Sequence, residues 1–478
     1  MAITDILEMG RQGMMANRQA LQTTAQNVAN ANTPDYSRQK PVMEAHEQSV
    51  HGGTRVGGGV EVKKVIRVHD QFIQNHLLEE SKALGQLKSR SDGLRLLEGI
   101  IGEQGTDLGN LMTKFFNDVR ELSVNPGTAS SRAVVSESAD AVAFAFRRLS
   151  DSLSTIQKDI DTQIEHTVLT TNSMAKELAE MNIGIVRAQA MGQSPNELLD
   201  RRDVLERQIT EKLGYEILHD ERNLATVIAP GVGVLVQGER VNELRVRRTP
   251  EEGQKGPGAL DVFLGDGNSE HRLTKSISQG EIGGLISVRD AIINPAAEHL
   301  DQVAYQFAQS VNQAHRQGMG MDGTSGRDLF TEAFEASGSA GRIALNQDIK
   351  NNNLALAVGY GVEDPSDNRV ALEMSDIQSK ALLSNALTSP SEGDGRYTLG
   401  ESINEIIGTV GVHTQRTNQM FDHQKAIVDQ LDNYRQSVSG VSLEEEAIQM
   451  MQFQTAFNAA SKMIRVGDEL LEEVLKLR

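Results

Sequence analysis

The sequence predicts a mainly helical α+β protein: a long helical-bundle rod with an inserted small antiparallel β domain and a coiled coil of terminal helices. Three observations lead to this class. Long segments repeat apolar residues at helical spacing, short β-like runs gather in one central stretch, and both chain ends carry apolar residues at intervals of seven. At 478 residues, the chain has room for about three domains of ordinary size.

Composition narrows the functional classes. The net charge is −19, from 47 Lys and Arg against 66 Asp and Glu, and such a field disfavours binding to nucleic acid. The chain has no cysteine, which excludes disulfides, thiolate catalysis and Cys-ligated metal sites. No apolar run is long enough to cross a membrane, so we expect no membrane insertion. Residues 1–32 lack the pattern of a secretory signal.

The first segment carries the seam of a helix that packs along another helix. Its strong positions recur at sevens: Leu7, Met14, Leu21 and Val28. The alternate positions are weaker: Ile3, Gly10, Asn17 and Thr24. Because a period of seven keeps one stripe facing a partner, this segment predicts a helix in a coiled coil.

The last segment repeats the pattern. Its strong positions are Leu443, Met450, Phe457, Ile464 and Leu471. Their predicted partner row is Ala447, Gln454, Ser461, Asp468 and Leu475. Ser442, with Glu445 three residues later, predicts a capping box that opens this helix.

Two explanations of these seams remain open. Either each terminal segment packs on a neighbouring globular domain, or the two segments pair with each other. The polar residues in the seams and their place at the chain ends favour pairing. Since one helix pair leaves its outer faces wet, it should gain stability from further copies of itself. We therefore expect residues 1–40 and 440–478 to form a terminal coiled-coil inner domain, with the strong positions as its self-assembly seam.

Helical patterns cover most of the remaining chain. They span residues 72–101, 132–188, 196–209, 300–311 and 402–438, and Asn125-Pro126-Gly127 predicts a turn between the first two. These patterns predict a helical rod domain from 41–212, 286–330 and 400–439. Residues 331–399 are rich in Gly, Ser, Asp and Asn, and predict a loop-rich segment returning to this domain.

The central stretch changes period. Short β-like runs are separated by Gly, Asp, Asn and Pro: 215–218, 224–228, 232–236, 244–246 and 260–264. They predict an inserted β-rich outer domain over 213–285, stabilised by its own small core rather than by the helices. In a nested chain, this domain would lie at the end of the rod opposite to the termini.

Motifs for chemistry are weak. Gly231-Val232-Gly233 lacks the third glycine of a dinucleotide site, and the carboxylates over 322–328 lack calcium-loop spacing. His69 and His76 are seven residues apart, which alone makes no specific metal site. The charges over 200–203 suggest ion pairs within a helix. We therefore expect no catalytic site, no cofactor and no metal.

The segment from Asn27 to Gln39 resembles the signature of bacterial flagellar axial proteins, which comprise rod, hook and hook-associated proteins. The matching residues are Asn27, Asn30, Asn32, Thr33, Pro34, Tyr36 and Ser37. Asp35 stands where this signature usually has glycine, and aspartate adopts turn geometry less freely.

Three further segments extend the resemblance. Residues 439–447, followed by 453–457, resemble the C-terminal signature of axial proteins. Residues 196–205 and 366–372 are similar to motifs of the hook-associated protein 1 family. Together the matches cover nearly the whole chain in order.

The resemblance implies a structural subunit without enzymatic activity, which forms a ring of copies at the hook–filament junction. The implied partners are the hook protein, the third hook-associated protein, and a flagellar export chaperone at the C-terminal helix. The implied location is the extracellular flagellum, reached by flagellar type III export. The alternatives are another axial protein (hook, rod or third hook-associated protein) and an unrelated coiled-coil scaffold or enzyme.

Overall fold

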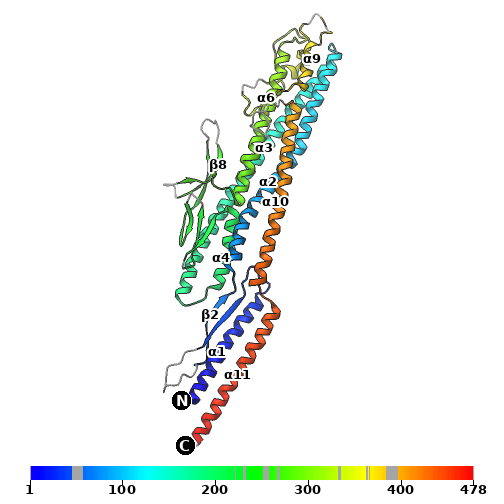
Figure 1. Cartoon of the computed structure of the whole chain (residues 1–478). Coiled ribbons are helices and arrows are strands. Elements are labelled where there is room, and N and C mark those ends of the chain that lie inside the picture. The colour runs from blue at the N-terminus through cyan, green and yellow to red at the C-terminus, as the bar shows by residue number, and fades with distance from the viewer. Residues whose placement is uncertain are drawn as a thin grey trace. The chain divides into compact units, whose positions relative to one another are not determined.

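The computed structural model describes most of the chain (Figure 1). The described residues are 2–45, 58–220, 222–229, 233–250, 258–265, 270–331, 335–361, 364, 366–383 and 397–476. Gly231, Val232 and the side chain of Ile3, which enter the sequence predictions, lie outside this description.

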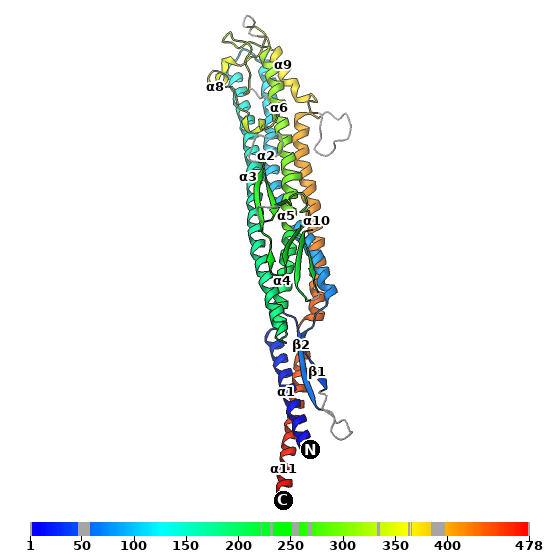
Figure 2. The same ribbon diagram turned by 90° about the vertical axis from the view of Figure 1, so that its left-hand side faces the viewer.

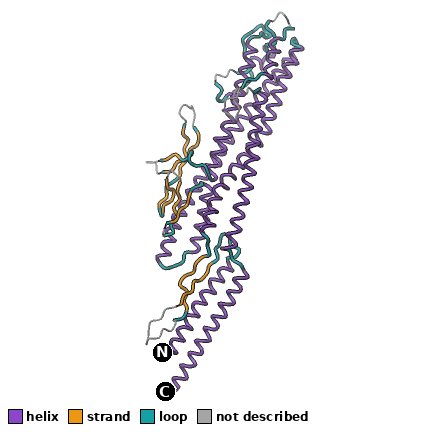
Figure 3. The backbone as a smooth tube through the Cα atoms, viewed as in Figure 1, coloured by secondary structure: helices purple, strands orange, loops and turns teal. Residues whose placement is uncertain are grey.

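The described residues confirm a mainly helical α+β fold (Figure 3). The helices are α1 (Ala2–Ala29), α2 (Gln71–Val124), α3 (Ala129–Ala190), α4 (Asn196–Leu213), α5 (Gly280–Val288), α6 (Asn294–Arg316), α7 (Ser339–Arg342), α8 (Gln347–Asn351), α9 (Arg369–Asp376), α10 (Leu399–Ser439) and α11 (Leu443–Lys476). The strands are β1 (Gln39–Ala45), β2 (Val60–Arg67), β3 (Glu216–His219), β4 (Ala225–Ala229), β5 (Gly233–Gln237), β6 (Arg240–Val241), β7 (Leu244–Thr249), β8 (Ala259–Leu264) and β9 (His271–Arg272).

Each predicted helix is present, and most are longer than their apolar pattern. The chain forms two compact units, and α2, α3 and α10 each contribute to both. Unit 1 comprises residues 1–84, 168–280 and 423–478, and unit 2 comprises 85–167 and 281–422. No helix in the described part of the chain is long and apolar enough to span a membrane.

Unit 2 is a helical bundle. Figures 1 and 2 show its parts of α2, α3 and α10 running beside α6. A cluster of aromatic rings fills its core, with centroids 5.0–6.2 Å apart. The rings belong to Phe115, Phe116, Phe146, Phe307 and Phe330. Each fully buried ring contributes about 1.5–3 kcal/mol. Three of the five rings lie outside α2, so the core joins segments that are far apart in the sequence.

Unit 1 contains a hairpin that the sequence analysis places in the helical domain. β1 and β2 pair antiparallel from Gln39↔Arg67 to Ala45↔Val60, with a register shift between Val42 and Met43. The prediction is wrong here because the apolar residues of these strands alternate only partly, and the bulge breaks the period of two.

The inserted β domain is antiparallel, as predicted, and consists of two sheets ordered β3-β4-β5-β6 and β7-β8-β9. Its expected independence from the helices is wrong. Asn172 of α3 exchanges hydrogen bonds of 2.8 and 2.9 Å with the backbone of Leu244. Asn182, ten residues further along α3, does the same with Ala225 at 2.9 and 3.0 Å. Each asparagine satisfies strand backbone groups that the sheet leaves unpaired.

The β domain also shares unit 1 with both chain ends, whereas the sequence analysis expects it at the opposite end from them. Its entry and exit touch at two glycines. A Cβ on Gly214 would lie 2.5 Å from Cβ of Gln279, and one on Gly280 would lie 2.5 Å from N of Gly214. Both glycines have positive φ, near +70°. The two ends of the inserted domain therefore meet directly after α4, which keeps the domain next to this helix.

Unit 2 contains a buried histidine whose two ring nitrogens are both used. His315 of α6 lies 2.8 Å through Nδ1 from the carbonyl oxygen of Arg327, and its Nε2 accepts the N–H of Ala357 at 2.9 Å. Burial lowers the pKa of His315, and the cationic side chains of Arg327 and Arg132 add to this shift. The hydrogen bond to the Arg327 carbonyl and the charge of Asp328 oppose it without cancelling it. The folded unit therefore holds a neutral imidazole.

We predict that unit 2 loses stability in mild acid. The unfolded chain binds a proton at His315 near pH 6.5 and the folded chain binds it only at lower pH, so the free energy of unfolding falls as pH drops below about 6.5. Denaturant unfolding at pH 7.5 and 5.5 should reveal this loss, and His315→Gln should reduce it. His76→Gln, at an exposed position of α2, is the control. An equal pH response in all three proteins would contradict the prediction.

Candidate assembly site at the paired ends of the chain

The two chain ends pair as antiparallel helices (Figure 1). Leu7 lies against Gly467, Gly10 against Ile464, and Asn27 bonds to Glu446. These contacts advance from 7 to 27 along α1 while they return from 467 to 446 along α11, so the register holds over nearly the whole of α1. Of the two explanations of the seams, the structure selects pairing.

Small residues set the closeness of this pair. A Cβ on Gly10 would lie 2.8 Å from Cγ1 of Ile464, and one on Gly467 would lie 2.7 Å from Cδ2 of Leu7. Ala460 is also buried, and its Cβ lies 3.6 Å from a Cβ built on Gly13. Since side-chain size at the contact fixes the distance between helix axes, these residues let the two backbones approach.

The partner row predicted for the last helix is wrong. All five of its residues are exposed: Ala447, Gln454, Ser461, Asp468 and Leu475. The buried row lies one residue earlier, at Glu446, Ala460 and Gly467, with Phe453 half-buried. In a heptad seam the second row lies either three or four residues after the first, so both positions are compatible with the spacing of the strong positions. The buried row contains Ala460 and Gly467, which are too weakly hydrophobic to distinguish it from the neighbouring row in the sequence.

The strong seam positions divide into two groups. Those in the middle of each helix are half-buried: Leu7, Met14, Leu21, Met450, Phe457 and Ile464. The outer ones are exposed: Val28 by 37%, Leu443 by 55% and Leu471 by 38%. One chain thus covers the middle of the seam and leaves the rest open.

Asn27 uses every hydrogen-bonding position of its side chain. Its Nδ2 donates to the Gln39 carbonyl and to Oε2 of Glu446, both at 2.9 Å. Its Oδ1 accepts the Gln39 N–H and the Tyr36 hydroxyl, also at 2.9 Å. Burial, together with nearby carboxylates, raises the pKa of Tyr36 to about 12, so the phenol remains a donor. With four bonds and 1% exposure, this amide fastens the signature loop to the start of α11.

Glu446 is a fully buried carboxylate in the first turn of α11. Nε of Arg38 donates to its Oε1 at 2.6 Å, and the backbone N–H of Arg38 donates to the Ser439 carbonyl at 2.8 Å. The helix dipole also favours an acid here. Removing one partner of such a pair costs about 3–5 kcal/mol, while the intact pair adds little net stability. Its main effect is to specify which loop meets which helix end.

The predicted capping box is half formed. Oγ of Ser442 accepts the N–H of Glu445 at 3.5 Å. The carboxylate of Glu445 does not return to the cap; it accepts a 2.6 Å hydrogen bond from Nη1 of Arg38.

Asp35, which replaces the usual glycine, adopts the left-handed conformation with φ of 60°. This conformation costs roughly 1–2 kcal/mol for a residue with a Cβ. The carboxylate offsets that cost by accepting from Nη2 of Arg435 at 2.7 Å and Nη2 of Arg207 at 3.4 Å. Arg207 also donates to Asp432 at 3.1 Å. The loop therefore keeps its glycine geometry and gains an ionic attachment to α4 and α10.

The motif over 196–205 meets the same loop. Oδ2 of Asp200 accepts the N–H of Ser37 at 3.1 Å. Nη1 of Arg67, on β2, donates to Asp200 at 3.1 Å and to Asp203 at 2.6 Å. The expectation that these charges pair within their helix is wrong for Asp200, because the hairpin brings in Arg67, which the sequence analysis did not single out. It holds for Asp203, which lies 3.6 Å from Arg202 of its own helix as well as beside Arg67.

The remaining residues of this motif are also bound. Nδ2 of Asn196 donates to Oε1 of Gln39 and to the Val65 carbonyl, both at 3.1 Å. Arg202 is buried and pairs within its own helix with Glu206 at 3.0 Å and with Asp203 at 3.6 Å. The signature loop, residues 196–205 and the start of α11 are far apart in the sequence. They form one cluster where the end of α1 meets the start of α11.

The signature residues thus have two roles. Asn27, Tyr36 and Ser37 bond inward, whereas Asn32, Thr33 and Pro34 are exposed. Asn30 is half-buried; its Nδ2 donates to the Gln26 carbonyl at 3.0 Å and its Oδ1 accepts from Thr33 at 3.2 Å. The exposed residues border an open hollow of about 470 Å³ whose other side is formed by residues 435–442.

The site offers contacts and no reactive constellation. Within the described residues, no group of three or more His, Asp or Glu side chains could hold a metal ion. Apolar side chains instead remain exposed along α11: Leu443, Ile448, Met451, Met463, Val466, Leu470, Leu471, Val474 and Leu475. A helix with apolar residues on more than one face is suited to bind further helices.

Three family models match the chain. Residues 94–330 match "Flagellar hook-associated protein FlgK helical domain". Residues 7–36 match "Flagella basal body rod protein", and residues 435–477 match "Flagellar basal body rod FlgEFG protein C-terminal". Residues 7–36 contain most of α1 and most of the signature loop, and residues 435–477 contain all of α11.

Relatives match over their full length. Flagellar hook-associated protein 1 of Bacillus subtilis is 28% identical over 98% of this chain and 97% of that protein. Proteins of the same name from Salmonella typhimurium and Escherichia coli are 22% identical over the whole of both chains. The solved structure of the flagellar hook junction protein FlgK from Burkholderia pseudomallei has the same fold, with a TM-score of 0.67 and 15% sequence identity. The superposition covers 76% of this chain and the whole of that one.

We predict that Asn27→Ala opens the paired ends. The change removes one buried hydrogen bond each from Tyr36 and Glu446 and two from the backbone of Gln39, and each buried group left unpaired costs about 1–3 kcal/mol. Limited proteolysis should then cut near both chain ends at a much higher rate, while unit 2 resists as before. Asn30→Ala is the control, since its side chain bonds only to the nearby Gln26 and Thr33 in the described structure and is half-buried. Equal cleavage of the two variants would contradict the central role of Asn27.

We further predict that Gly467→Leu separates α1 from α11. The new side chain meets Leu7 on a face that accepts no Cβ without a shift. Gly408→Leu is matched in helix propensity, and a Cβ there meets nothing within 4 Å. Hydrogen exchange of α1 and α11 should accelerate in the first variant only, and equal protection in both would show that the close approach is unimportant.

Proposed function

Because the chain belongs to the flagellar hook-associated protein 1 family, we propose that it is a structural subunit of the bacterial flagellum, which self-assembles into a ring that joins hook and filament. The observation that carries this proposal is the cluster that closes the two chain ends onto each other. It is built from the signature loop, residues 196–205 and the start of the last helix, three of the motifs that carry the resemblance.

The paired ends supply the surface for self-assembly. Leu443 and Leu471 of the predicted seam are exposed in the single chain, and the outer face of α11 is apolar. Covering such a side chain contributes about 1.5–3 kcal/mol. A ring of copies would cover these faces, which is the role proposed for the strong seam positions. The exposed residues Asn32, Thr33 and Pro34 would contact the neighbouring copy across the hollow beside residues 435–442.

The remaining assignments follow from the family. The subunit would bind the hook protein on one side and the third hook-associated protein on the other. A flagellar export chaperone would bind α11 before assembly, since its apolar faces are exposed until neighbours cover them. The subunit would reach the extracellular flagellum by flagellar type III export. Residues 1–40 and 440–478 would form the inner domain and residues 213–285 the outer one.

A labelled protein should appear as a band at the hook tip in electron micrographs of isolated flagella. Label along the filament, along the hook, or only inside cells would favour another axial protein or a scaffold and would overturn the proposal.

We predict that Phe457→Asp abolishes this band. Phe457 is half-buried in the middle of the seam, and a carboxylate buried there without a partner costs several kcal/mol. Phe457 belongs to unit 1, so the melting of unit 2 should not change. Gln454→Asp, at an exposed position one turn away, is the control and should still assemble. Normal assembly of Phe457→Asp would contradict the seam.

A further inference from the structure

An open hollow of about 650 Å³ lies in unit 1 between the last turns of α3 and the turn joining β5 to β6. Its lining includes Ile183, Val186 and Leu224, and Ile183 is 39% exposed. This hollow is separate from the cluster at the chain ends, and no motif of the sequence analysis accounts for it.

Hydrogen bonds from α3 to the β domain fix the shape of the hollow. Nδ2 of the buried Asn182 donates to the carbonyls of Ala225 at 2.9 Å and Gly238 at 3.0 Å. Gly238 has φ of 61° and forms the turn between the two strands. Since α3 and the turn are bonded to each other directly, little ordering is needed before a partner binds.

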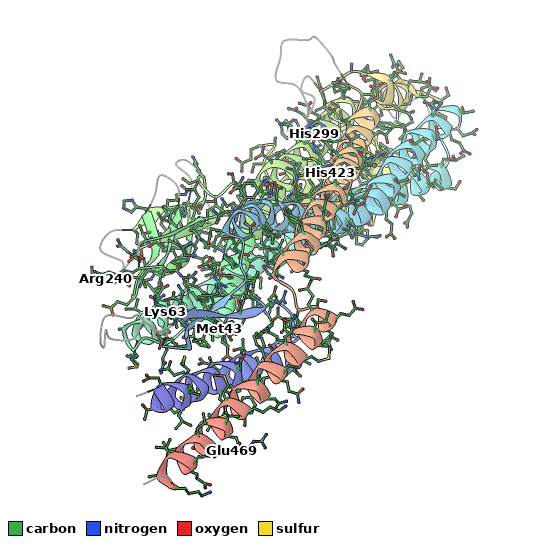
Figure 4. The ribbon with its side chains drawn as sticks, turned by 60° about the horizontal axis from the view of Figure 1, so that its bottom comes forward. Met43, Lys63, Arg240, His299, His423 and Glu469 are labelled. Carbon is green, nitrogen blue, oxygen red and sulfur yellow. The ribbon has the colours of Figure 1, made fainter. Side chains whose placement is uncertain are left out.

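Three arginines surround the apolar floor: Arg187, Arg222 and Arg240 (Figure 4 labels Arg240). All three are exposed, and across the residues that the structure describes no ion pair involves any of them. Other arginines of unit 1 behave differently: Arg201 pairs with Glu177 and Arg67 with Asp203. In a chain of net charge −19, this is a local concentration of free cationic groups.

We propose that this hollow docks an acidic surface of a second copy of the chain. The inference rests on the proposed ring, in which identical subunits are neighbours. Subunits that each carry −19 repel one another, so their contacts require local attraction. In a ring, one face of a subunit meets a different face of the next, which lets arginines meet carboxylates. Arginine bonds carboxylates in bidentate geometry, and an apolar floor strengthens such bonds by excluding water.

The absence of cysteine allows a direct test. Glu239→Cys places a single thiol on the rim of the hollow, where a benzophenone maleimide can be attached. Irradiation of isolated flagella should give an adduct of two copies of this chain, identified by mass spectrometry. An adduct with a different protein, or no adduct, would overturn the proposal.

Charge reversal supplies the second measurement. Arg187→Glu, Arg222→Glu and Arg240→Glu combined should remove the adduct and lower the number of copies per hook by about tenfold, the loss expected for three exposed ion pairs. The three corresponding Arg→Lys changes keep the charge and should retain the adduct. Lys275→Glu reverses an exposed charge elsewhere in the β domain and is the control. Circular dichroism confirms that each variant is folded, since all these side chains are exposed.

The outcomes separate this inference from the proposed function. If the unmodified protein forms the band at the hook tip and the triple Glu variant does so equally well with its adduct intact, the docking surface is wrong and the function stands. If the unmodified protein forms no band, both fail, because the inference depends on the ring.

Discussion

The pairing of the two chain ends depends on the side chain of Asn27, whose four hydrogen-bonding positions are all occupied. The amide of Asn27 joins the end of α1, the loop that follows it, and the buried carboxylate of Glu446 at the start of α11. The two partners are 419 residues apart in the sequence, so their bond closes the chain on itself. Because a buried amide with four partners has no alternative arrangement of equal energy, it fixes the loop, the helix start and their relative position together.

Electrostatics then give this closure its specificity. Arg38 forms an ion pair with Glu446, and Arg67 forms ion pairs with both Asp200 and Asp203. Asp35 forms ion pairs with two arginines, Arg207 and Arg435. Buried and half-buried pairs of this kind add little net stability, but a mismatched pair is costly. A chain with 66 Asp and Glu residues offers each arginine many carboxylates with which it could pair incorrectly. Placing arginines at the cluster and around the hollow beside α3 gives the molecule defined points of attachment.

The seam between α1 and α11 has a different character. Glycine and alanine occupy its closest points, and larger apolar residues lie at its margins, half-buried or exposed. A pair built in this way is held by close backbone approach within the chain, and it presents its larger side chains to neighbours. The same helices can therefore close one subunit and contribute to contacts between subunits.

The sequence by itself determined the class of fold, the long helices and five of the seven described strands of the inserted domain. These features have a local period, which short-range apolar spacing reveals. It also identified the motifs that match axial proteins, and hence the family. The hairpin β1–β2 was missed because its bulge interrupts the alternation on which strand prediction depends.

Only the tertiary structure decided which polar residues meet. The partner row of α11 was misplaced by one residue because Ala460 and Gly467 are buried for their smallness, a property that hydrophobicity does not record. Arg38, Arg67 and Glu446 look like ordinary surface charges in the sequence, since an ion pair across hundreds of residues leaves no periodic trace. Asn172 and Asn182 were missed for the same reason: their role is to satisfy backbone groups that a distant strand leaves unpaired, and only the folded chain brings those groups to them.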